Sequence, residues 1–94
     1  MDEVDRVVHE PARLLIMALL SGAEKADFLF LLRETALTKG NLSNHLAKLE
    51  EAAYIEIDKT FRGKVPLTLA RLTPKGRSAL QIYRKTMNGL LRKL

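Results

Sequence analysis

Hydrophobic residues recur at helical spacing in four stretches of the chain and alternate with polar residues in one. Positions three or four apart share a helix face, whereas strict alternation is typical of a half-buried strand. The helical stretches are residues 9–21, 27–35, 38–53 and 74–94, and the alternating stretch is residues 54–72. The order predicts an α+β fold that is mainly α, with a three-helix core, a β-hairpin and a last helix in one domain, 1–94.

Residues that start helices stand where the pattern needs them. Pro11 fits a first helical turn, where its missing N–H costs nothing. Asp27, Thr38 and Thr73 stand before the later helices, as N-cap residues whose side chains accept hydrogen bonds from free backbone N–H groups. Only residues 36–37 separate the second helix from the cap of the third, and so short a connection predicts a helix-turn-helix.

The alternating stretch predicts a hairpin with a basic tip. Ile55 and Ile57 alternate with acidic residues, and a second alternating run follows the turn. Gly63 suits a turn that needs a positive φ, and Arg62 and Lys64 flank it.

The third helix has two different faces. Leu42, Leu46 and Leu49 form a narrow stripe that we expect to be buried. His45 lies beside this stripe, which favours a half-buried structural role over a contact with DNA bases. The residues outside the stripe are small or polar: Gly40, Asn41, Ser43, Asn44, Ala47, Lys48 and Glu51.

Such an outward face suits the major groove of DNA. Asparagine can pair with adenine through two hydrogen bonds, serine can donate or accept, and lysine can reach guanine or a phosphate. A solvated helix can carry the same residues, but the tight turn before this helix and the basic hairpin after it favour the DNA interpretation.

The charge of the chain is consistent with a polyanionic partner. The chain has 16 basic and 11 acidic residues, a net charge of +5, and a pI of about 9.8. Four of the acids lie in the first ten residues, so the rest is more strongly basic. Charge alone does not select nucleic acid, because many basic proteins bind neither DNA nor membranes. The longest apolar run, residues 14–20, is too short for a membrane span of about 20 residues.

The chain has no cysteine, which excludes disulfides, thiolate metal sites and cysteine nucleophiles. Two isolated histidines do not make a metal site, so we expect no metal and no other cofactor. Neither a paired-carboxylate site nor a phosphate-binding glycine loop is evident, which argues against an enzyme. The acidic start is unlike a signal peptide, and the lack of disulfides favours a cytoplasmic, nucleoid-associated protein.

Several stretches resemble the winged-helix transcriptional regulators of the ArsR/MarR-like superfamily. They are residues 11–14, 37–46, 49–51, 54–55, 59–63, 66–68 and 72–77. The resemblance implies a homodimer on pseudo-palindromic double-stranded DNA, with the third helix in the major groove and the hairpin wing along the backbone or the adjacent minor groove. The sequence departs from the family in three places. Glycine is common at the position of Ala53, and an acid is common at the position of Lys39. The metal-binding cysteines of the ArsR branch are absent.

The resemblance also assigns roles to individual residues. Base reading falls to Asn41, Ser43, Asn44 and Lys48. Phosphate contacts fall to Thr38 and Lys39, and to Arg62 and Lys64 at the wing tip.

The last helix has the spacing of a coiled-coil seam. Leu80, Tyr83, Met87, Leu90 and Leu94 are three, four, three and four residues apart. This face can fold back on its own domain or pair with a second copy, and we expect a homodimer through it, with the first helix joining the interface.

The sequence leaves three functions to compare. The leading one is a sequence-specific transcriptional regulator, most simply a repressor; no residue identifies an effector ligand. The alternatives are a winged-helix module for protein contacts and an architectural protein that binds DNA with little sequence preference. Leu29 and Phe30, which lie off the core face of the second helix, either pack within the domain or contact another protein.

Overall fold

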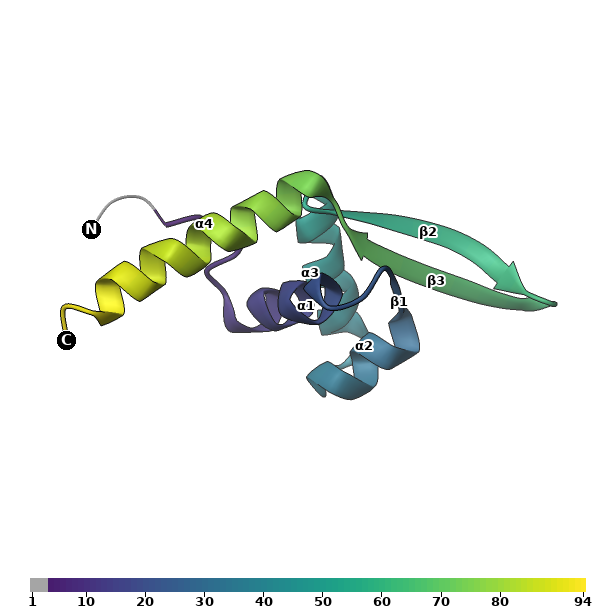
Figure 1. Cartoon of the computed structure of the whole chain (residues 1–94). Coiled ribbons are helices and arrows are strands. Elements are labelled where there is room, and N and C mark those ends of the chain that lie inside the picture. The colour runs from purple at the N-terminus through teal and green to yellow at the C-terminus, as the bar shows by residue number, and fades with distance from the viewer. Residues whose placement is uncertain (1–3) are drawn as a thin grey trace.

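The computed structural model describes residues 4–94, so the first three residues of the acidic start lie outside it (Figure 1). In chain order the elements are α1 (Pro11–Ser21), β1 (Ala26–Asp27), α2 (Phe28–Thr35), α3 (Lys39–Glu51), β2 (Ile55–Arg62), β3 (Val65–Leu72) and α4 (Pro74–Leu91). This order confirms the expected fold class, α+β and mainly α. None of the helices in residues 4–94 has the length and hydrophobicity needed to cross a membrane.

Each helix begins at a residue whose side chain accepts hydrogen bonds from the first turn. The caps expected at Asp27, Thr38 and Thr73 are all present. Glu10 caps α1 through the N–H groups of the next turn and has an extended backbone, with φ −153° and ψ 125°. The first helix therefore begins at Pro11 and not at residue 9.

Two other helices are shorter than the pattern predicts. The third helix ends at Glu51, and the left-handed backbone of Ala53, with φ 64°, prevents it from reaching residue 53. The last helix ends at Leu91. The N–H groups of Lys93 and Leu94 donate to the carbonyl groups three residues earlier, so these residues form a turn and not a continuation of the α-helix. Leu94 lies beyond α4 and is 97% exposed, so the helical seam does not extend to it.

The strands form an antiparallel sheet in the order β1-β3-β2. The hairpin of β2 and β3 pairs Ile55 with Leu72 at its base and Arg62 with Val65 at its tip. The two-residue strand β1 pairs with β3 and was not expected, because it is too short to show alternation. Its second residue, Asp27, also caps α2. The hairpin extends well beyond the helices (Figure 1).

The core lies where α1, α2 and α3 meet the base of the hairpin. Its buried apolar residues are Val8, Ile16, Met17, Leu20, Ala26, Leu31, Leu42, Leu46, Leu49, Ile55 and Ala70. The leucine stripe expected on the third helix is therefore entirely buried. Phe30 is half-buried and packs against this core, whereas Leu29 is 68% exposed. Phe30 thus packs within the domain, and only Leu29 is free for another contact.

Candidate nucleic-acid interface

The outward face of α3 is open to solvent. Burial of Leu42, Leu46 and Leu49 fixes the rotation of this helix about its axis. The exposed residues on its cap and outer face include the six residues of this helix and its cap that the resemblance assigns to DNA: Thr38, Lys39, Asn41, Ser43, Asn44 and Lys48.

The beginning of α3 carries hydrogen-bond donors. The Thr38 hydroxyl oxygen accepts the N–H of Asn41 at 3.1 Å, which leaves the hydroxyl hydrogen free to donate. The backbone N–H groups of Lys39 and Gly40 have no partner within residues 4–94. A Cβ at position 40 would have nothing within 4 Å, so the surface is open there. Unpaired N–H groups and positive potential at a helix start suit a phosphate.

The end of α3 has the opposite charge. Glu50 and Glu51 are exposed in its last turn, and carboxylates repel the phosphate backbone. The part of α3 without carboxylates therefore extends from Thr38 to Lys48.

The wing carries its cations at the tip. Arg62 and Lys64 are exposed on either side of Gly63, whose φ is 64°. A positive φ at the first position of a two-residue hairpin turn favours glycine. The tip therefore presents two cations at the far end of a narrow support.

The base of the wing lies beside α3. A depression of about 240 Å³ is lined by Ser43 and Ala47 from α3 and by Ile57, Lys59 and Thr68 from the hairpin, among others. Lys59 is exposed, so this depression, which Glu50 also lines, contains a cation that the sequence assignment omitted. The alternation of side chains along the hairpin could have indicated this position, because it places Lys59 on the same face as Ile57.

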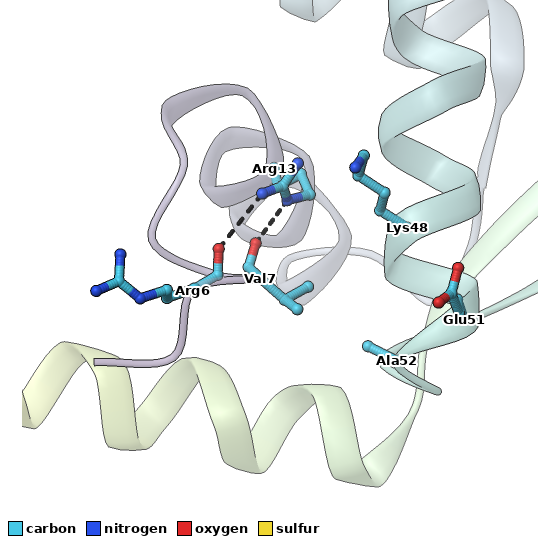
Figure 2. Close-up of a pocket in the computed structure, with 6 residues that line it drawn as sticks. All are labelled: Arg6, Val7, Arg13, Lys48, Glu51 and Ala52. Atoms are coloured by element: carbon cyan, nitrogen blue, oxygen red, sulfur yellow. Dashed lines mark hydrogen bonds between the residues drawn. The ribbon is translucent and has the colours of Figure 1, made fainter. Parts of the chain in front are cut away.

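A second depression lies on the other side of α3 (Figure 2). It measures about 430 Å³ and is lined by Arg6, Val7, Arg13, Lys48, Glu51 and Ala52. The Arg13 guanidinium is turned toward the backbone, with Nε donating to the Val7 carbonyl at 2.7 Å and Nη2 to the Arg6 carbonyl at 3.3 Å. The exposed cations beside this depression are therefore Lys48 and Arg6, and Arg6 was not expected from the sequence.

His45 fixes α3 against the start of α1. Its Nδ1 lies 3.2 Å from Nη1 of Arg13 and 3.4 Å from a carboxylate oxygen of Glu10. Burial opposes ionisation of Glu10, but hydrogen bonds from the N–H groups of Ala12 and Arg13 and the nearby positive charges outweigh it and lower the pKa of Glu10. The half-buried structural role expected for His45 is confirmed.

Tyr54 fixes the junction between α3 and the wing. Its hydroxyl donates to the carboxylate of Asp5, which also accepts the N–H of Val7 at 2.9 Å. This hydrogen bond, with burial, raises the pKa of Tyr54 to about 12. The N-terminal segment is therefore attached at the point where the wing leaves α3.

The seam residues of the last helix have different environments. Leu80 and Tyr83 pack against the core of their own chain. Met87 and Leu90 are half-buried. A groove of about 370 Å³ between α1 and α4 is lined by Leu14, Ala18, Tyr83 and Met87, among others.

Comparison with known proteins agrees with this geometry. Residues 12–91 match the model of a family described as a winged helix DNA-binding domain. The chain belongs to this winged helix family. The winged-helix part of the resemblance is thus confirmed, while assignment to the ArsR or MarR branch is not.

Several proteins are similar to this winged helix over most of their length. The uncharacterized protein MJ0432 of Methanocaldococcus jannaschii is 39% identical over 79 residues, which are 83% of this chain and 85% of that protein. A transcriptional regulator homologue from Pyrococcus horikoshii OT3 has a TM-score of 0.89 at 25% identity, over 95% of this chain and 88% of that chain. A PadR family transcriptional regulator from Eggerthella lenta DSM 2243 shares the fold, with a TM-score of 0.72 at 21% identity, over 94% and 85% of the two chains.

Proposed function

We propose that this chain is a transcriptional regulator, most simply a repressor, that acts as a homodimer on a pseudo-palindromic site in double-stranded DNA. The observation that carries the proposal is the open polar face of α3 beside a basic wing. The family match to a DNA-binding domain and the similarity to a transcriptional regulator homologue support it. The protein would work in the cytoplasm, at the nucleoid, as one domain without a cofactor or catalytic activity.

Side-chain chemistry and position separate the residues that would read bases from those that would bind phosphate. Asn41, Ser43, Asn44 and Lys48 lie on the exposed face of α3 and would read base edges in the major groove. Thr38 and Lys39 lie at the start of α3 and would bind phosphate. Arg62 and Lys64 at the wing tip would add phosphate contacts, which supply affinity and orientation without sequence information.

A second copy would complete the apolar surface of α4. Ile82 and Leu91 are 63% and 57% exposed, and Leu15 on α1 is also exposed. Met87 and Leu90 extend the same helix beyond the part that packs on the core. Two copies joined through α4 and α1 would present two reading helices about 34 Å apart, one turn of DNA, and this favours an inverted-repeat site.

Leu90→Glu tests the dimer. The two-fold symmetry would place the new charge in the seam twice, so we expect the variant to sediment as a monomer where the wild type is a dimer. Gln81→Glu is the matched control, because Gln81 is exposed on the opposite side of α4 and receives the same charge. Equal masses for the wild type and both variants would contradict an interface at Leu90.

Selection from a random pool of duplexes tests the DNA function. We expect enrichment of an inverted repeat, bound as two chains per duplex. Binding without enrichment would favour an architectural protein. No binding to any duplex would overturn the proposal and leave the protein-contact alternative, for which the exposed Leu29 is the candidate contact.

A further inference from the structure

The tip of the wing carries an exposed apolar pair. Phe61 is 67% exposed and pairs across the hairpin with Pro66. Phe61 lies outside the core and among the residues that do not pack against it. Packing of the core therefore does not explain an aromatic side chain at this position, which within the domain can stabilise only the hairpin, through its cross-strand pair with Pro66.

Phe61 lies on the face of the hairpin that packs on the domain at its base. Side chains alternate between the two faces of a strand, so Phe61 shares a face with Ile55, Ile57 and Lys59. Ile55 is buried in the core, and Ile57 and Lys59 line the depression beside α3. The face that begins against α3 therefore ends at Phe61, while Val65 at the same tip lies on the opposite face.

Cations flank this apolar pair. Lys59 precedes Phe61 on its own face, Lys64 lies in the turn, and Arg62, which pairs with Val65, lies on the opposite face. An apolar side chain among cations suits a partner with a negatively charged rim and an apolar interior. The minor groove of DNA has this combination, with phosphates along its edges and stacked bases below. Apolar side chains such as phenylalanine and proline can enter between base steps there.

We propose that Phe61, supported by Pro66, is an apolar wedge that enters the minor groove next to the α3 site and partly unstacks one base step. This inference rests on the proposed function, because it requires α3 in the major groove. Pyrimidine–purine steps unstack most easily, so the step under each wing would be TA or CA/TG. Phe61 would thus add sequence preference outside the bases that α3 touches.

The reach of the wing is consistent with this placement. Phe61 is six residues from Ile55, the buried residue at the base of β2, so at a rise of about 3.3 Å per residue it lies about 20 Å along the strand from the core. The minor groove that follows a bound major groove is about half a helical turn away, or about 17 Å. The wing is therefore long enough to reach it.

The experiment uses the selected duplex with 2-aminopurine in place of adenine at the step under the wing. Unstacking raises the fluorescence of this base, and energy transfer between dyes on the duplex ends reports bending. We expect wild-type protein to raise the fluorescence and bend the duplex. Phe61→Ala should abolish both signals and weaken binding by about tenfold, in the range of losing one aromatic–base stack. Phe61→Leu should retain part of both signals.

Val65→Ala is the matched control, because Val65 is 65% exposed at the same tip but on the other face. It should keep both signals and near wild-type affinity. Thermal melting of the free variants checks that each is folded. If the wild type binds no duplex, the proposed function fails and the wedge with it. If the wild type binds without unstacking, or if Phe61→Ala behaves like Val65→Ala, the wedge alone is overturned. A change in the mass of free Phe61→Ala would instead assign Phe61 to a contact between copies.

Discussion

Gly76 and Tyr54 approach so closely that no side chain fits between them. A Cβ at position 76 would lie 2.1 Å from the carbonyl oxygen of Tyr54 and 2.8 Å from its carbonyl carbon. The N–H of Thr73 donates to the same oxygen at 3.0 Å. The first turn of α4 is thus packed directly on the backbone that links α3 to the wing. This contact sets the position of α4 relative to the candidate DNA-binding surface.

Gly76→Ala should therefore destabilise the protein. The added methyl group meets backbone that cannot move alone, so α4 must shift, and we expect a loss of about 3 kcal/mol in the free energy of unfolding. Urea denaturation measures this value. Gly89→Ala is the control in the same helix, because a Cβ there has nothing within 4 Å. It should stabilise α4 by up to about 1 kcal/mol through helix propensity. Similar effects of the two substitutions would contradict the close contact.

Ala53 stands where glycine is common in the ArsR/MarR-like regulators that the sequence resembles. Replacing it with glycine gives a second stability prediction. Ala53 has a φ of 64°, and a left-handed alanine costs about 1–2 kcal/mol. Ala53→Gly removes this strain but increases the entropy of the unfolded chain, so we expect a net gain of about 0.5–1 kcal/mol. Ala52→Gly is the adjacent control, because Ala52 has a right-handed backbone with φ −76°. It should lower the stability. A loss at position 53 as well would show that the strain is compensated.

Some of the structural features of the fold could be predicted from the sequence pattern, and others could not. Caps and the leucine stripe depend on local spacing, so Asp27, Thr38 and Leu46 could be placed from the sequence alone. The role of Gly76 could not, because it depends on the backbone of Tyr54, 22 positions away. β1 is likewise defined only by its pairing with β3.

In the candidate site, too, residues placed by local periodicity could be predicted and residues placed by tertiary packing could not. The exposed face of α3 follows from helix periodicity, and its exposure agrees with the expectation. Arg6 and Lys59 were missed because their positions beside α3 depend on how the N-terminal segment and the hairpin pack. Glu10 was missed as the cap of α1, although it directly precedes Pro11.

The hydrogen bond between Tyr54 and Asp5 makes the stability depend on alkaline pH. It raises the pKa of Tyr54 from 10.0 to about 12. Between these values the unfolded chain releases a proton that the folded chain retains, so unfolding becomes more favourable as the pH rises. The contribution of Tyr54 is therefore fully present below about pH 10 and is lost as the pH rises through about 12.

Tyr54→Phe isolates this effect, because all other groups that titrate at alkaline pH, the lysines included, are the same in both proteins. At pH 8 the variant should be less stable by about 1 kcal/mol, owing to the lost hydrogen bond. Above pH 10 the wild type should lose stability faster than the variant, so the two curves converge. Chemical denaturation across this pH range measures both curves. Curves that remain parallel up to pH 12 would show that the hydrogen bond to Asp5 does not hold the proton.

Asn44 and Arg62 separate reading of the sequence from general affinity. Asn44 is exposed on α3, and Arg62 is exposed at the wing tip. If Asn44 pairs with a base, Asn44→Ala should weaken binding to the selected site by about 1–3 kcal/mol and leave binding to random duplexes nearly unchanged. Arg62→Ala removes a phosphate contact, so it should weaken binding to both kinds of duplex and reduce the slope of log K against log salt by about one unit.

Titrations of both duplexes over a range of salt concentrations distinguish these two effects. Gln81→Ala serves as the control, because it removes an exposed polar side chain from α4, away from α3 and the wing. It should match the wild type on both duplexes, since surface substitutions outside an interface have small effects. If Asn44→Ala and Arg62→Ala lower binding to specific and random duplexes in the same proportion, then Asn44 does not read a base and acts like a phosphate contact, which carries no sequence information.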